Sequence, residues 1–326
     1  MNYFPLLLAM ASRMLLRILP LLFLAFLLLG MFSFLSVAQV SGAPDKAAAP
    51  SSDSSLLSRH YREGEILVYH MKGSNRGQSG TTVYEAQATG VVKKNSDGKF
   101  IEECTWSNLV VNGAAVALSP AATNFRQVLS LDTFMGVPDL SQVIPLVGPI
   151  TDLLTFYSDL LLASPQGSLL KAGDHFYFKH GTPNSWADGN YVLTGEDSID
   201  FDVTLTGVDL PSKIATVVVR HVVPAQPQIK LLADWMRTPV SDTPNNWVQV
   251  SRNFDSKSDS DKYVAGAGKE TFDVELKVSL ADGRIVSGTL NNPVEVSERH
   301  CADLALTHCG DAVRYQILRQ IEIQIQ

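Results

Sequence analysis

The chain has 326 residues, of which 45% are hydrophobic and 18% charged, so it can bury a sizeable core. Its formal net charge is −7, and no run of basic residues occurs along it. Because nucleic-acid affinity depends on clustered Lys and Arg that displace counterions from phosphates, this balance excludes a nucleic-acid partner. The length allows one large domain or two ordinary ones.

The first 38 residues predict export across a membrane. Arg13 and Arg17 precede an uncharged apolar run, which ends before the small residues Ser36-Val37-Ala38. A basic flank, an apolar core and small residues at the cleavage point are typical of a signal peptide, predicted here as residues 1–38. The run is also long enough for the alternative, an uncleaved anchor at residues 18–37 that makes the membrane a partner. Both interpretations place the rest of the chain outside the cytoplasm, either periplasmic or secreted.

Residues 39–60 are rich in Ala, Pro and Ser, which predicts a flexible spacer. The remainder, residues 61–326, is interpreted as one β-rich extracytoplasmic domain. A division into two domains near residue 165 stays open, since no linker or internal repeat marks it.

The dominant period beyond residue 65 is two. Apolar and polar residues alternate over residues 199–206 and 272–280, and again along residues 313–325, where Arg319 interrupts a row of apolar residues. Alternation indicates strands with one buried and one solvated face, which favours antiparallel pairing. Roughly ten such runs predict a mainly β (α+β) fold, as a large curved antiparallel sheet or open barrel.

One segment has the period of a helix. Apolar residues over residues 150–161 recur at helical spacing, and Pro165 follows the end of the pattern. The apolar arc of this predicted helix is unusually broad. It contains Leu153, Leu154, Phe156, Tyr157, Leu160 and Leu161.

Shorter helical pieces are predicted at residues 124–131, 139–144 and 226–237. Together with the longer helix, the first two predict a helical block over residues 124–163. Such a block is expected to pack on the concave face of the sheet.

Cys301 and Cys309 are close in sequence, on a loop between strand-like runs. In an oxidising compartment two such thiols are expected to form a disulfide bond. The alternative is a metal site that also uses His300 and His308, although the spacing matches no standard zinc pattern. Cys104 shares a strand face with aromatic residues, which predicts a buried, unreactive thiol.

The other polar candidates have simpler interpretations. Asp200 and Asp202 share one strand face and could bind calcium, but the threonines that follow them are typical of a solvated face. The Asp-rich loop at residues 255–261 lacks the glycine and glutamate of an EF-hand. His175 and His180 are expected on opposite strand faces. The sequence has no catalytic or phosphate-binding motif, so no cofactor or metal is predicted and an enzyme is disfavoured.

Two strand-like stretches carry a resemblance to a known group of proteins. Glu63-Gly64-Glu65-Ile66-Leu67-Val68-Tyr69 and the opening at residues 98–102 resemble uncharacterised secreted bacterial β-rich envelope proteins. Some of those are similar to the open half-barrels of lipoprotein carriers, in which helices close a concave apolar sheet. The resemblance implies an apolar cavity for an acyl chain or a lipoprotein tail. This chain differs from the small carriers in its greater length and in its Cys301–Cys309 loop.

The leading hypothesis is a non-enzymatic cell-envelope protein that binds a lipid or another apolar small molecule between sheet and helices. The broad arc from Leu153 to Leu161 would line that site. One alternative is an envelope scaffold without a ligand cavity. A second is a hydrolase with a dispersed site, in which His175, His180 or His221 acts as the base.

Overall fold

The computed structural model describes residues 55–132, 140, 142–179, 184–188, 193–253 and 256–326. The predicted export segment and most of the predicted spacer lie outside these residues. The last residues of the predicted spacer belong to the folded domain, because Leu57 is fully buried in the main core and Arg59 is also buried. The folded domain therefore begins before residue 61.

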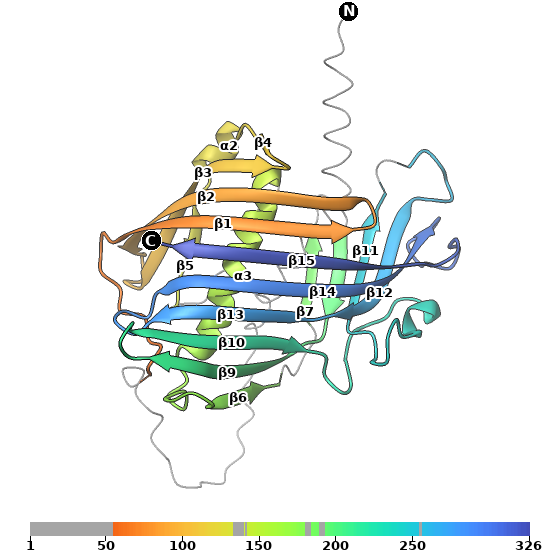
Figure 1. The fold of residues 1–326 in the computed structure, drawn as a ribbon. Helices are drawn as coiled ribbons and strands as arrows, with labels where there is room; N and C mark the ends of the chain where they lie inside the picture. The colour runs from red at the N-terminus through yellow and green to blue at the C-terminus, as the bar shows by residue number, and fades with distance from the viewer. Residues whose placement is uncertain (1–54, 133–139, 141, 180–183, 189–192, 254–255) are drawn as a thin grey trace, which may run out of the picture.

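The strands and helices of the described residues are labelled in Figure 1. The strands are β1 (Ile66–Gly77), β2 (Gly80–Lys94), β3 (Phe100–Val111), β4 (Ala114–Ala115), β5 (Gln127–Leu129), β6 (His175–Phe178), β7 (Asn184–Asp188), β8 (Leu193–Asp197), β9 (Asp200–Asp209), β10 (Ile214–Val222), β11 (Trp247–Arg252), β12 (Tyr263–Glu270), β13 (Phe272–Ser279), β14 (Ile285–Cys301) and β15 (Val313–Ile325). The helices are α2 (Pro120–Asn124), η3 (Ile144–Leu146), α3 (Val147–Ala163) and η4 (Asp234–Arg237), where η marks a 3-10 helix.

All the strands belong to one antiparallel sheet, whose main path runs β4-β3-β2-β1-β15-β14-β12-β11-β8-β7. A branch leaves β14 through β13, β10 and β9 to β6. Within the described residues, β4 and β7 end the path without pairing with each other, so the sheet is open. The predicted large antiparallel sheet is confirmed. It has more strands than predicted, because short strands such as β5 and β7 carry too few residues for a clear alternation.

The last strand of the chain lies in the middle of the sheet. β15 pairs with β1 on one side, from Tyr69 opposite Ile325 to Arg76 opposite Leu318, and with β14 on the other side. Residues 317, 319, 321, 323 and 325 of β15 are buried, whereas the even-numbered residues between them are half-buried or exposed. The alternation seen in the sequence thus corresponds to one inward and one outward face.

The sheet is interrupted along a line that crosses several strands. β14 pairs with β13 over its first part and with β12 over its second part, and Thr271 lies between these two partners, opposite Pro293. Because proline has no N–H, it cannot complete the ladder at this point. β8 and β9 are separated in the same way by Ser198 and Ile199. We call β6, β9, β10 and β13 the α3 half of the sheet, and β7, β8, β11 and β12 the β12 half.

Helix α3 lies across one face of the sheet, behind β15, β14 and β13 in the view of Figure 1. Most of its residues are buried, and they join the main hydrophobic cluster together with inward residues of β1, β9, β10 and β13. Phe156 packs closely on β14, where a Cβ atom at Gly288 would lie 3.0 Å from its ring. The helix predicted at residues 150–161 is confirmed, with a longer extent.

Two of the shorter predicted helices are wrong in part. Within residues 124–131 the chain forms strand β5, which pairs with β3 opposite Glu102–Cys104, because Gln127 and Leu129 both find buried places there. Within residues 226–237 only η4 is helical. The backbone N–H groups of Gln228 and Lys230 instead donate to side chains of Ser198 and Glu196. Of the piece predicted at residues 139–144, only Ile144, where η3 begins, is helical among the described positions, and residues 139 and 141 lie outside them.

Candidate functional site

The apolar arc predicted on the long helix is brought together in the interface between α3 and the sheet. Leu153, Phe156 and Leu160 are fully buried, Leu154 and Tyr157 are nearly so, and Leu161 is half-buried at the edge of the same cluster. Their apolar neighbours are inward residues of the strands. This interface is the candidate site, and its polar contacts define how the helix is held.

The first polar contact surrounds Glu102 of β3, which is buried beneath α3. Its Oε2 atom accepts a 2.5 Å hydrogen bond from the Tyr69 hydroxyl of β1 and a second hydrogen bond from the Tyr157 hydroxyl of α3. Arg59 Nε lies 3.6 Å from Oε1 of Glu102, and Arg59 Nη2 donates to Glu65 at 2.8 Å. A buried carboxylate needs such partners. This contact ties α3 to the start of the domain.

The surroundings of Glu102 make its proton and that of Cys104 harder to remove. Burial raises the pKa of Glu102, although Arg59 and the two tyrosine hydroxyls oppose the shift. Burial also raises the pKa of Cys104 well above its ordinary value, and the neighbouring Glu102 adds to this. The free thiol is thus buried and protonated, as the sequence predicted.

The second polar contact is an ion pair between Asp152 of α3 and Arg319 of β15. Oδ1 of Asp152 contacts Nη2 of Arg319, and Oδ2 accepts a hydrogen bond from the Tyr84 hydroxyl of β2. Gly73 of β1 makes room for the Tyr84 ring, since a Cβ atom there would lie 2.2 Å from it. Burial lowers the pKa of Arg319 to about 10, so the guanidinium is still charged at neutral pH.

The third polar contact joins Asp159 of α3 to His221 of β10. Nε2 of His221 lies 2.9 Å and 3.0 Å from the two carboxylate oxygens, and both side chains are fully buried. The imidazole packs between Phe201 and Phe272, with ring centroids 4.7 Å and 4.6 Å away. Burial raises the pKa of Asp159, and His221 opposes this shift. The histidine proposed as a possible base is thus held in the core and paired with the helix.

A different polar group occupies the line where the strands are interrupted. Asn292 donates a 3.0 Å hydrogen bond to Oε1 of Glu270, and Asn246 donates to the backbone oxygens of Ser198 and Glu270 at 3.0 Å and 3.1 Å. Asp197 Oδ2 and Glu270 Oε2 are buried with no hydrogen-bond partner in the described part of the chain. Burial raises the pKa of both carboxyls well above the ordinary range, and Asp197 raises that of Glu270 further. Both groups are therefore favoured in the neutral form.

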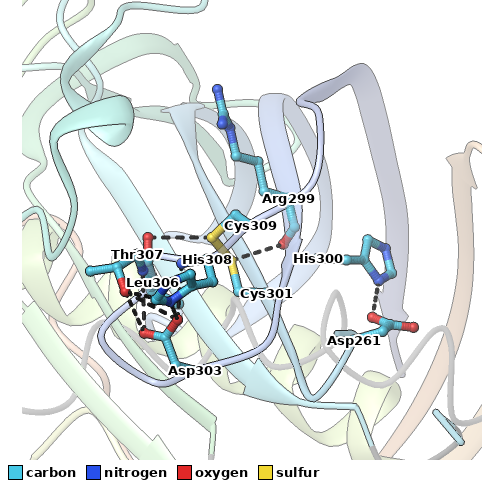
Figure 2. The surroundings of a disulfide bond; sticks show 9 residues. All are labelled: Asp261, Arg299, His300, Cys301, Asp303, Leu306, Thr307, His308 and Cys309. Carbon is cyan, nitrogen blue, oxygen red and sulfur yellow. Dashed lines mark hydrogen bonds and ion pairs between the residues drawn. A yellow bond between two sulfur atoms is a disulfide. The ribbon is translucent and has the colours of Figure 1, made fainter. Parts of the chain in front are cut away.

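The predicted disulfide bond is present between Cys301 and Cys309, with a sulfur–sulfur distance of 2.02 Å. Figure 2 shows its surroundings, in which His308 lies 3.0 Å from Asp303 and His300 contacts Asp261. Both sulfur atoms are used in the covalent bond, and each histidine faces an aspartate. The alternative metal site at these residues is therefore not formed.

The remaining predicted residues are scattered. Asp200 is buried and accepts a 2.6 Å hydrogen bond from the Tyr177 hydroxyl, so the interpretation of a solvated carboxylate pair is wrong for this residue. Asp202 is half-buried, 4.0 Å from the exposed His175. His180 and Asp255 lie outside the described residues. The described part of the Asp-rich loop, residues 256–261, is largely exposed.

Several buried polar residues were missed from the sequence, although a signal existed for one of them. Glu102 lies between Phe100 and Cys104 on the inward face of β3, which the alternation places there. Asp152 and Glu270 had no such signal, because the first lies on a helix and the second at the end of a strand.

Comparison with known proteins adds no assignment, since no family model and no curated protein sequence matches this chain. Among the described residues, no group of three or more His, Cys, Asp and Glu side chains is placed to hold a metal ion. None of the described helices combines the length and the apolarity that crossing a bilayer requires.

Proposed function

We propose that this protein is an exported, non-enzymatic binding protein of the cell envelope. Its ligand would be apolar, such as the acyl chain of a lipid, and would lie between α3 and the sheet. The observation that carries the proposal is the arrangement of α3, whose broad apolar arc faces the inward side chains of the strands while separate polar contacts hold it.

The polar contacts and the apolar arc have different roles in this proposal. Asp152, Tyr157 and Asp159 bind partners on the sheet and thereby fix the position of the helix. Leu153 and Phe156 present only hydrocarbon. A hydrocarbon chain inserted between the layers would replace one apolar contact by another, so little hydrophobic stabilisation is lost. Small-molecule sites are typically apolar with a few fixed polar groups.

Lipid retention in the full-length protein tests this function. The protein, purified in a detergent that does not strip lipid, is compared by native mass spectrometry before and after delipidation. We expect a bound lipid in the wild type and in the control Leu210→Trp, whose parent side chain is 71% exposed. We expect a marked loss of lipid in Leu153→Trp, because the larger ring fills the interface.

Absence of lipid from the wild type, in both preparations and after incubation with lipid vesicles, would reject the function. Circular dichroism of each variant separates loss of binding from loss of folding. The scaffold alternative is favoured by β6, an edge strand of the described sheet that exposes Tyr177 and Phe178. A lipid-free protein with a reproducible crosslinked envelope partner would support that alternative instead.

A further inference from the structure

Residues 55–62, here called the strap, precede β1 in the chain and form neither helix nor strand. Their side chains are nevertheless part of the folded domain. Leu57 is fully buried in the main hydrophobic cluster, and Arg59 is also buried. Tyr61 stacks on Phe100 of β3, with the two ring centroids 5.6 Å apart. The strap is therefore held by a few side chains rather than by a strand ladder.

The turn between β13 and β14 forms a seat for the strap. The backbone N–H of His60 donates to the backbone oxygen of Asp282 at 2.8 Å. Gly283 allows this close approach, because a Cβ atom there would lie 2.1 Å from the backbone oxygen of Ser58. Its φ of +69° also favours glycine. Segments held by few contacts open locally at a lower free energy than core strands, so the strap is suited to detach by itself.

One buried carboxylate connects the strap to α3. Nε of Arg59 lies 3.6 Å from Oε1 of Glu102, while Oε2 of Glu102 accepts a hydrogen bond from the Tyr157 hydroxyl of α3. Arg59 and Tyr157 thus stabilise the same negative charge from two sides. A buried charge that loses one of its partners is strongly destabilising. Loss of either contact therefore makes ionised Glu102 more costly and weakens the contact that remains.

We propose that the strap detaches as a unit while the sheet stays folded, and that Glu102 couples its docking to the position of α3. In this device Arg59 and Tyr157 are positioning residues, and the docked strap locks the helix against the sheet. Detachment withdraws Leu57 from the main cluster and uncovers apolar surface there. The inference goes beyond the proposed function and does not depend on whether a lipid binds.

Hydrogen exchange of the full-length protein, resolved to single amides, tests the detachment. The N–H of His60 reports on the strap, and so does the N–H of Leu131, which donates to the Tyr61 hydroxyl at 2.8 Å. After correction for intrinsic rates, we expect both to exchange together, about tenfold or more faster than the amides of β15. This measurement needs no variant. Exchange of both amides only together with β15 would overturn the inference.

The coupling is tested by Tyr157→Phe, which removes a hydroxyl from α3 and leaves the strap unchanged. Because coupling between two contacts is reciprocal, the two reporter amides should exchange about fivefold faster or more once Glu102 loses this partner. The matched control is Tyr84→Phe, which removes a different hydroxyl, bonded to Asp152 of α3. It should leave the exchange of the strap unchanged. Unchanged rates in Tyr157→Phe, or equally faster rates in both variants, would overturn the coupling through Glu102.

The reverse direction is tested within the strap. Arg59→Met should accelerate exchange at the two reporter amides and at the α3 amides around Tyr157, with β15 unchanged. The control Arg62→Met removes an arginine whose side chain is 76% exposed, and it should change none of these rates. The same effect in both variants, or an effect of Arg59→Met that is absent from α3, would overturn the inference. If Arg59→Met does not fold, the wild type and Tyr157→Phe decide the outcome.

Discussion

The two halves of the sheet bury charge in different ways. Around α3 the two buried aspartates of the helix each meet a side chain of the sheet, since Asp159 meets His221 of β10 and Asp152 meets Arg319 of β15. At the interruption of the sheet, Asp197 and Glu270 are both buried, Asp197 raises the pKa of Glu270 further, and Asn292 donates a hydrogen bond to Glu270. A partner on the sheet opposes the rise that burial causes in the pKa of Asp159, whereas Asp197 adds to the rise in the pKa of Glu270.

The difference reflects what each set of polar side chains replaces. Around α3 they join two layers, because the contacts of Asp152 and Asp159 each link a helix residue to a strand residue. At the interruption of the sheet, Asn246 takes the place of missing backbone partners, since its side chain bonds the backbone of Ser198 and Glu270. Buried polar residues are therefore expected to stabilise the position of α3 in one half and to complete the strand ladder in the other.

The largest effect is expected from breaking a pair in the α3 half. His221→Leu leaves Asp159 buried without its partner, which should lower the free energy of unfolding by about 3–5 kcal/mol. The double variant His221→Leu/Asp159→Leu should recover most of this loss, because no buried charge is left unpaired. Urea unfolding followed by circular dichroism measures both. A double variant as unstable as the single one would show that packing, not charge pairing, dominates here.

An intermediate effect is expected at the far end of the β12 half. Cys301→Ser/Cys309→Ser opens the small loop closed by the disulfide bond and should lower the free energy of unfolding by about 2–3 kcal/mol on the chain-entropy estimate. Cys301 packs with Val248 and Val250 of β11. Hydrogen exchange should therefore accelerate in β11 and β12 and stay unchanged in β9 and β10. Equally faster hydrogen exchange in both halves would show that the two halves do not open independently.

The smallest effect is expected at the interruption itself, and it depends on pH. The folded-state pKa of Glu270 is raised, so the native protein holds a proton that the unfolded chain releases, and stability is lost as pH rises from about 4 through the folded pKa. Glu270→Gln keeps the acceptor for Asn292 and removes this loss. The variant should exceed the wild type by about 1–2 kcal/mol at pH 8 and match it near pH 4.

Urea midpoints at the two pH values measure this prediction. Glu275→Gln is the matched control, because Glu275 lies on the outward, exposed face of β13. Its stability should follow the wild type at both pH values. If the stability of Glu270→Gln had the same pH dependence as that of the wild type, Glu270 would be ionised in the native protein at pH 8. That result would contradict the neutral form inferred for this buried carboxyl group.

Much of the fold could be predicted from the sequence because alternation and helical spacing report directly on burial. The inward rows of β13 and β15 and the helix around Leu153 follow from these periods. The strand at Gln127–Leu129 could not be foreseen, since three residues carry no period. Its place depends on distant partners: Gln127 accepts from Trp106 and donates to the backbone oxygen of Ile150.

The candidate site was predicted only in its apolar part. The helical spacing of the residues from Leu153 to Leu160 predicts that they are buried together. The pairing of Asp152 with Arg319, by contrast, joins positions that lie far apart in the chain. Nothing local distinguishes an aspartate that will be buried on a helix from one that is solvated. Arg319 did stand out as a break in an apolar row, and its meaning emerged only with its partner on α3.

The place of β15 has a consequence for how the protein is made. Its partners are β1, the first strand of the described sheet, and β14, the strand before it in the chain. A chain without β15 therefore leaves the edges of β1 and β14 exposed in the middle of the sheet. Folding to the native topology therefore cannot be completed before residues 313–325 have been synthesised.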